Sequence, residues 1–551
     1  GPTPVAVAAA RLTRPAPDPR ELRPDLPDEL ARILETCLAR APSDRFSSAA
    51  EVASALISAS GRAAPASMMP PSLGPSDPAS PARSVRLAVL PLAPVGLGDD
   101  AYLADGVAED LVDALSQMPG MRVVSYGSAV AERETRDPRG VGRKLGVAII
   151  VQGSLKRLPG DKLRLTVRLI GVEDGLQLWA HRYDTTAADL LDVNEEAAQA
   201  IAQAASINAP QPDRKLADPI AVDLYLRARA RYRDFWLEGV TESVKHYEQA
   251  LARVPDSPLL VAGHALSLAR LAFFSAGRME SAREASRRAL TLAPDLGEAH
   301  LAAAAVALQC GQMVDAYRSA VQAVARSPSL AEAHQIRGRV LSETGPADTA
   351  LAALRTAYEL DPASAVTRRE IVRLLALAGR WDEAEALQRK HLPTDPAERA
   401  AAVVVKLRLA LWRADRAEIN RMRDELLALR STAAIAAPSF TLFADALSRA
   451  VDNDGVIEVD SFIPAVASEP GSVRRVLFFH QVAIETNAQF GSPANAVGLL
   501  RRAVDMGFTD HVWFEHCIAI ASLRGDPEFE ALAARVEART REVRILAGAA
   551  G

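Results

Sequence analysis

The chain has 551 residues, of which 49% are hydrophobic and 24% charged, and its net charge is −5 at pH 7. This length exceeds what one hydrophobic core supports, so three or more domains are expected. The slightly acidic balance argues against a nucleic-acid partner. Its three cysteines are odd in number and widely spaced, which argues against a disulfide framework and indicates a reducing compartment.

The sequence contains no uninterrupted apolar stretch of the length that crosses a membrane, and no secretory signal is visible. We therefore expect a cytoplasmic protein with no membrane partner. His511, Glu515, His516 and Cys517 lie close together, but no fourth ligand is in register. Their aromatic neighbours favour packing, so no metal site is predicted.

The first 59 residues are predicted to form a short all-α piece. Apolar residues recur at helical spacing in two runs, Leu30, Ile33, Leu34, Cys37 and Leu38, then Val52, Ala55 and Leu56. Residues 41–46 form the turn between these helices. Residues 60–84 consist mainly of Ala, Pro, Ser and Gly, and we expect a semi-extended linker there.

Residues 85–207 are predicted to form a small mixed α/β domain. Apolar or alternating runs indicate strands at 85–92, 122–125, 147–152, 163–169 and 176–183. Helical patterns occupy 102–118, 137–145 and 189–205. Pro159, Gly160 and Asp161 mark a hairpin turn. The expected order is β-α-β-α-β-β-β and then a helix.

Three residue types recur at a fixed interval in the middle of the chain. Each position lies 34 residues after the one before it in three series: Gly277, Gly311, Gly345 and Gly379; Ala282, Ala316, Ala350 and Ala384; Pro294, Pro328, Pro362 and Pro396. This period is typical of stacked helix–turn–helix units. Such units build a curved surface that holds other proteins, so the sequence predicts an α-solenoid over 218–396.

These residues resemble the tetratricopeptide repeat. The alanine lets the two helices of a unit approach closely, the glycine forms the turn between them, and the proline ends the second helix. The series fits units at about 263–296, 297–330, 331–364 and 365–398. Residues 397–551 are expected to be helical with a weaker period. Gly491 and Ala496 mark one further unit, and 513–546 is expected to cap the last apolar face.

The first segment resembles the C-terminal end of a bacterial Ser/Thr protein kinase catalytic domain. The matching stretches are Leu26-Pro27-Asp28-Glu29-Leu30, residues 37–46 and Ala50-Glu51-Val52. The resemblance implies that Arg45 is a structural arginine. Since no glycine-rich ATP loop, strand lysine or catalytic Asp loop is present, this chain is expected to have no catalytic residue and no cofactor. ATP and Mg²⁺ are expected only for a kinase lobe upstream of Gly1.

The α/β segment resembles the TolB-like amino-terminal domain. The matching residues are 87–92, 102–109, 122–125, Gly153-Ser154-Leu155 and Leu178-Trp179-Ala180. The resemblance implies a non-enzymatic module. Such a module often lies between a signalling head and tetratricopeptide repeats.

The inner face of the repeats is the candidate binding site. In the repeat family, positions 2, 5, 9 and 12 of the first helix line this face. Here they include Glu298 and the nine predicted contact residues His264, Leu271, Phe274, Leu301, Leu308, Gln335, Arg339, Arg369 and Arg373. The early half is apolar and the later half carries three arginines, which suits an extended peptide with apolar and acidic parts. A solvated helix face with ordinary arginines is the alternative.

The sequence therefore predicts the regulatory, partner-binding C-terminal region of a bacterial Ser/Thr kinase. Its array would recruit protein partners or substrates and raise their local concentration. The alternative is a non-catalytic scaffold or signalling adaptor. No Ser/His/Asp arrangement, phosphate-binding loop or zinc spacing supports a small-molecule enzyme.

Overall fold

A computed structural model describes residues 18–39, 85–205, 216–390, 396–432, 447–452 and 472–549, apart from isolated positions within these ranges. The chain divides into two compact units, Gly1–Pro81 and Ala82–Gly551. In the first unit, η1 (Pro19–Glu21) precedes α2 (Asp28–Cys37), which confirms the first predicted helix. The second predicted helix, Arg45 and the linker lie outside the described residues.

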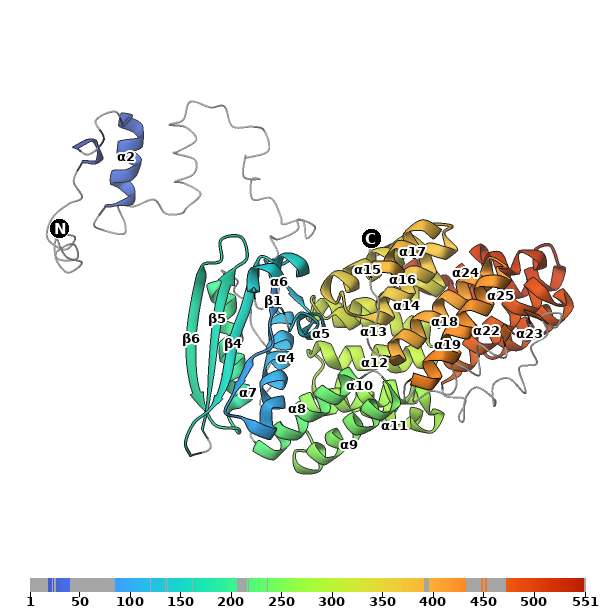
Figure 1. The fold of residues 1–551 in the computed structure, drawn as a ribbon, viewed down its shortest axis with the longest axis horizontal. Helices are drawn as coiled ribbons and strands as arrows, with labels where there is room; N and C mark the ends of the chain where they lie inside the picture. Colours follow the sequence, from blue (N-terminus) through green and yellow to red (C-terminus); the bar gives the residue numbers. More distant parts are fainter. Residues whose placement is uncertain are drawn as a thin grey trace. The chain divides into compact units, whose positions relative to one another are not determined.

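The second unit begins with a mixed α/β sheet (Figure 1). Its strands are β1 (Val85–Val89), β2 (Ala93–Val95), β3 (Met121–Val124), β4 (Ile149–Arg157), β5 (Leu163–Gly171) and β6 (Gln177–Thr185). The order is β3-β1-β4-β5-β6, and β2 pairs with β4. Strand β1 is parallel to β3 and β4, whereas β4, β5 and β6 form an antiparallel meander.

Helices lie on both faces of this sheet. They are η3 (Gly98–Ala101), α4 (Tyr102–Ser116), α5 (Tyr126–Val130), α6 (Pro138–Leu145) and α7 (Leu190–Ala204). Leu87 and Val89 face the core shared with α4 and α7, while Ala88 faces a second core with Val141 of α6, as strand alternation requires. The predicted element order is confirmed. Sequence analysis missed β2 and α5, which are too short for a periodic pattern.

Paired helices follow the sheet. Their bounds are α8 (Pro219–Arg233), α9 (Leu237–Arg253), α10 (Pro258–Phe274), η4 (Ala276–Arg278), α11 (Met279–Leu292), α12 (Gly297–Gln309), α13 (Met313–Arg326), α14 (Ala331–Thr344), α15 (Ala347–Leu360), α16 (Ala365–Leu377), α17 (Trp381–Lys390), α18 (Pro396–Trp412) and α19 (Arg416–Thr432). After a gap in the described residues come α22 (Val473–Phe490), α23 (Pro493–Asp505), α24 (His511–His516), η5 (Ile518–Leu523) and α25 (Pro527–Ala549). None of the described helices is long and apolar enough to span a membrane.

Most of the 34-residue marks have the roles expected of them. Pro294, Pro328 and Pro362 follow the ends of α11, α13 and α15, whereas Pro396 begins α18. All four alanines of the series are 0% exposed, because each lies where the two helices of a unit meet. Gly311, Gly345 and Gly379 have φ values of 73°, 77° and 73°, a left-handed conformation that favours glycine. Gly277 is different, since it lies within η4. The predicted turns are therefore confirmed at three of the four glycines.

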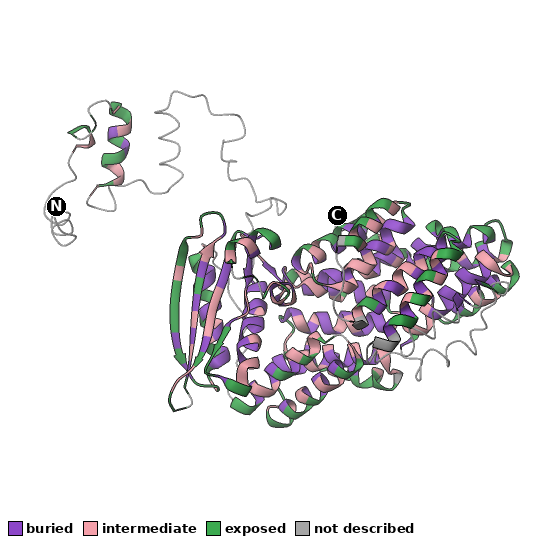
Figure 2. Ribbon diagram, viewed as in Figure 1, coloured by how far each residue is buried: buried purple, intermediate pink, exposed green. Residues whose placement is uncertain are grey.

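The C-terminal helices return to the middle of the array. Helix α25 packs against α13 and α14 as well as against α23. Helix α22 contacts α10, α12 and α18, and its residues Phe479–Ala488 are all buried (Figure 2). The C-terminal segment was expected to cover only the last repeat. It instead shares one core with α12–α17, which includes Leu301, Leu354 and Trp513.

The sheet and the array are joined by hydrogen bonds at strand β3 and at the start of α5. The Ser329 hydroxyl donates to the Met121 carbonyl at 2.6 Å and accepts from the Val123 amide at 3.1 Å. The hydroxyls of Ser125 and Ser128 donate to Asp361 at 2.6 and 2.8 Å. Both partners on the array lie in inter-repeat turns, so these turns cover an edge strand of the sheet.

The buried histidine His334 of the array is expected to make the folded protein less stable in acid. His334 is 7% exposed and donates from Nε2 to the Pro328 carbonyl at 2.8 Å. Burial lowers its pKa to about 4 from 6.5, although the hydrogen bond opposes this shift. Because the unfolded chain binds the proton first, stability should fall as the pH drops from 6.5 to 4, by roughly 3 kcal/mol for a shift of this size.

The measurement is urea denaturation of the wild-type chain and of His334→Gln at pH 8 and pH 4.5. We expect the variant to be the less stable protein at pH 8 and to lose less stability on acidification. An equal loss in both proteins would contradict the assignment of this histidine.

Candidate binding cavity

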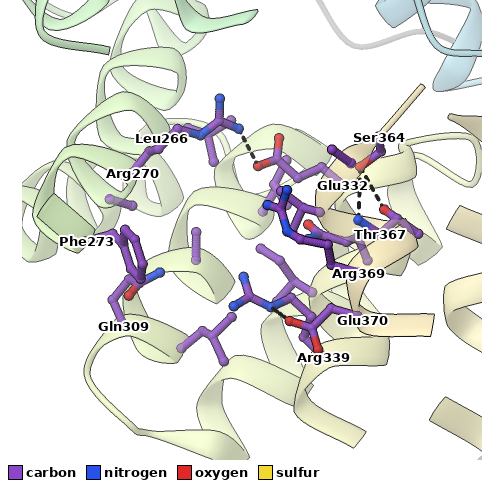
Figure 3. Close-up of a pocket in the computed structure, with 18 of the residues that line it drawn as sticks. Leu266, Arg270, Phe273, Gln309, Glu332, Arg339, Ser364, Thr367, Arg369 and Glu370 are labelled. Carbon is purple, nitrogen blue, oxygen red and sulfur yellow. Dashed lines mark hydrogen bonds and ion pairs between the residues drawn. The ribbon is translucent and has the colours of Figure 1, made fainter. Parts of the chain in front are cut away.

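The inner helices of the array surround a cavity of about 1220 Å³ (Figure 3). Its walls come from α8, α10, α12, α14, α16, α18 and α22, together with residues of α4, α5 and the segment 507–510. The first helix of each unit contributes because these helices form the concave side of a solenoid. The cavity is therefore built from segments that are far apart in the sequence.

Seven of the nine predicted contact residues line this cavity. They are Phe274, Leu301, Leu308, Gln335, Arg339, Arg369 and Arg373, and Glu298 lines it as well. His264 and Leu271 do not line it. The repeat spacing thus identified most of the inner face. Whether these residues bind a ligand remains a prediction.

His264 and Leu271 lie in helix-packing positions on α10. Leu271 is 5% exposed and belongs to a core with Val240 and Val244 of α9. The side chain of His264 is mostly buried, and burial lowers its pKa to about 4. Its Nε2 lies 3.9 Å from the Glu248 carboxylate, too far for a hydrogen bond.

Most arginines at the cavity wall are paired with acids of the chain itself. Arg270 reaches Glu332 at 2.9 Å, and Arg339 reaches Glu370 at 3.0 Å. Arg408 on α18 binds Glu485 of α22 at 2.6 Å. Two further pairs, Arg373–Asp510 and Arg474–Glu343, connect α16 and α14 to the C-terminal part. These pairs connect the inner helices with one another and with the C-terminal part.

The Arg373–Asp510 pair changes the interpretation of the three predicted arginines. Burial alone would lower the pKa of Arg373, but Asp510 and Glu370 offset this effect, so its pKa is raised. Asp510 also accepts from Gln481 and caps α24. A joint charge reversal of Arg339, Arg369 and Arg373 would therefore damage the fold. Such a variant could not test ligand capture alone.

Arg369 is the exception among the three. Its side chain has no hydrogen bond or ion pair with any residue that the structure describes. In Figure 3 it lies between the Arg270–Glu332 and Arg339–Glu370 pairs, and no dashed line reaches it. Burial lowers its pKa to about 10. The carboxylates of Glu370 and Glu398 oppose this shift, and repulsion from Arg339 and Arg368 adds to it.

Sequence analysis missed the acidic partners and the arginines outside the first four repeats. Glu332, Glu343 and Asp510 carry no signal in the repeat pattern, and Arg408 and Arg474 lie beyond the regular units. Asp361 was also missed. Burial raises its pKa, while hydrogen bonds from Ser125 and Ser128 oppose the shift.

The residues His511, Glu515, His516 and Cys517 form no metal centre. Within the described ranges, no group of three or more His, Cys, Asp or Glu side chains could hold an ion. His511 Nε2 lies 3.4 Å from Glu515, and Cys517 is fully buried. Trp513 and Phe514 pack against Phe508, which is the aromatic packing that the sequence favoured.

Comparison with known proteins supports the repeats directly. A family model described as tetratricopeptide repeat matches residues 342–407, so the chain contains tetratricopeptide repeats. A curated relative, "Putative adenylate cyclase 3" of Rhizobium meliloti (strain 1021), is 32% identical over 174 residues. That match covers 30% of this chain and 30% of the relative. The chain therefore spans less than a third of the relative's length.

Two solved structures show partial likeness. A thermophilic tetratricopeptide protein of Thermus thermophilus, TTC0263, is 22% identical with a TM-score of 0.29 and covers 33% of this chain and 98% of its own. The human IFIT1 dimer with m7Gppp-AAAA is 15% identical with a TM-score of 0.36 and covers 64% of this chain and 78% of its own.

Proposed function

We propose that this chain is the regulatory, partner-binding region of a bacterial signalling enzyme, and that the enzyme is a Ser/Thr protein kinase. The observation that carries the regulatory part is the tetratricopeptide array itself, whose repeats and curvature are typical of protein-binding modules. The proposal that the enzyme is a kinase rests on the resemblance of residues 26–52 to the C-terminal end of a kinase catalytic domain. The α/β sheet, which resembles a TolB-like domain, would connect the enzyme to the array.

A nucleotide cyclase is the second candidate for the attached enzyme. The observation in its favour is the 32% identity to a protein named as a putative adenylate cyclase. Both candidates give this region the same task, which is to bring partners to a catalytic domain. Recruitment raises the local concentration of a substrate without adding contacts at the catalytic centre.

Recruitment is proposed for the array as a whole. The inner face is a poor site for an extended peptide, because α22 and residues 507–510 already lie along it. A peptide along the full face would have to displace the Arg373–Asp510 and Arg474–Glu343 pairs. Breaking one partner of a buried ion pair costs about 3–5 kcal/mol.

The test is an activity assay on the full-length native gene product. Immunoblotting against the repeats should first detect a protein larger than these 551 residues. Incubated with Mg²⁺ and labelled ATP, that protein should transfer the γ-phosphate to protein, while the 551-residue chain alone should not. Formation of cyclic AMP would assign the cyclase alternative. Absence of both activities would leave a non-catalytic scaffold and overturn the proposal.

A further inference from the structure

One arginine at the cavity wall, Arg369, has no direct ion-pair partner among the described residues. The carboxylates of Glu370 and Glu398 attract its guanidinium, and Arg339 repels it. Removing a guanidinium from water without a partner is costly. A cost of this kind is often offset by a bound anion, because charge-assisted hydrogen bonds to a carboxylate are strong and two-pronged for arginine.

The wall across the cavity from Arg369 carries apolar side chains, with the polar side chains of Arg270 and Gln309 beside them. Phe273 lies there in the close-up, and Phe274, Leu301 and Leu308 line the cavity with it. Leu301 and Leu308 are each 1% exposed, so this wall is part of the core of the array. A ligand that reaches both sides must therefore carry an anionic end and a long apolar body.

The size and the enclosure of the cavity favour a compact ligand. Its volume of about 1220 Å³ is somewhat larger than that of ordinary small-molecule sites, which span roughly 300–1,000 Å³. Residues of α22 and of the segment 507–510 line its C-terminal side. The α/β sheet contributes α4 and α5 to the wall, so a ligand here would contact both parts of the regulatory unit.

We propose that this cavity is a binding site for an amphiphilic carboxylate of fatty-acid type, whose carboxylate is held by Arg369 and whose chain lies against Phe273, Phe274, Leu301 and Leu308. The ligand acts as an effector, distinct from the protein partners of the array. It gives Arg369 the direct ion-pair partner that the described residues do not supply, and it fills the apolar part of the cavity. The bound ligand contacts α4 and α5 as well as the inner helices of the array.

The experiment uses 11-(dansylamino)undecanoate, a fluorescent amphiphilic carboxylate, titrated into the 551-residue chain. We expect saturable binding of about one probe per chain, with increased fluorescence. Arg369→Met should weaken binding roughly tenfold to hundredfold, which is the usual value of a hydrogen bond to a charged group. The methyl ester of the probe should bind weakly, and its affinity should not change in the Arg369→Met variant.

Arg368→Met is the matched control. Arg368 is the adjacent arginine on α16, but it does not line the main cavity. Its replacement should change the affinity by no more than about twofold. Arg369→Met should fold at least as well as wild type, since it removes an unpaired buried charge. Thermal denaturation of both variants therefore separates lost binding from lost structure.

Three results would overturn the proposal. The first is a wild-type chain that shows no saturable binding. The second is equal affinity in wild type and Arg369→Met, which would place the probe elsewhere on the surface. The third is a ten-residue peptide of alternating Leu and Glu that binds more tightly than the probe and depends on Arg369, because that result would assign the cavity to peptides.

Discussion

Replacement of Gly153 by alanine is expected to unfold the α/β sheet, with a loss of about 3–5 kcal/mol, at the severe end of single substitutions. Gly153 lies on β4, opposite Val167 of β5. A Cβ atom there would lie 2.0 Å from the Thr166 carbonyl oxygen and 2.9 Å from Leu92 Cδ2. The first neighbour is backbone of a paired strand, so it cannot move aside without breaking the ladder.

The loss should extend beyond the sheet. Tyr225 of α8 and Leu260 of α10 belong to the same core as the strands, so the first helices of the array should lose stability as well. The measurement is urea denaturation followed by far-ultraviolet circular dichroism. Gly498→Ala on α23 is the control, because its Cβ would meet nothing within 4 Å. That change should stabilise the helix by about 0.5–1 kcal/mol. Equal midpoints for the two variants would contradict the model of the sheet.

Replacement of Arg408 by methionine is expected to cost about 3–5 kcal/mol, the usual result of leaving a buried charge uncompensated. The side chain of Glu485 is 0% exposed. It accepts hydrogen bonds from Arg408 at 2.6 and 3.1 Å and from Trp513 Nε1 at 2.7 Å. Without Arg408, the carboxylate would keep only the indole donor, and α22 would lose its ion pair with α18.

Two further variants separate charge from packing. The double variant Arg408→Met and Glu485→Met should recover part of the lost stability, since it removes both buried charges but leaves the Trp513 indole N–H without its acceptor. Arg399→Met, also on α18, should cost no more than about 1 kcal/mol, because Arg399 and Glu425 form an exposed pair at 3.4 Å. A double variant as unstable as Arg408→Met alone would show that packing, not the ion pair, holds α22 in place.

The repeating part of the fold could be predicted because each recurring residue is required by the geometry of its own helix pair. Ala350 is small where two helices touch, and Gly379 adopts a left-handed turn, so both positions depend on their own unit alone. The strands of the sheet could likewise be predicted from their alternation. In contrast, β2 contains Pro94 and has only three residues, which is too short for a pattern.

The packing of the C-terminal helices against the array, and the ion pairing of its arginines, could not be predicted in this way. The position of Arg373 on the inner face follows from repeat spacing, but its partner Asp510 is 137 residues away and has no place in the repeat. The repeat spacing places Arg369 on the inner face in the same way as Arg373. Only the three-dimensional arrangement of α16, α22 and the segment 507–510 separates the unpaired arginine from the paired one.

Partner recruitment by the array is tested most directly by zero-length cross-linking of the native gene product in its own cells. A carbodiimide joins carboxylates to partner lysines, and this chain suits it, with 69 acidic residues. We expect a small, reproducible set of proteins joined through acidic residues of α10–α19, with an unrelated acidic protein as control. A cross-linked set that matches the control would contradict the assignment of the array as a recruitment module.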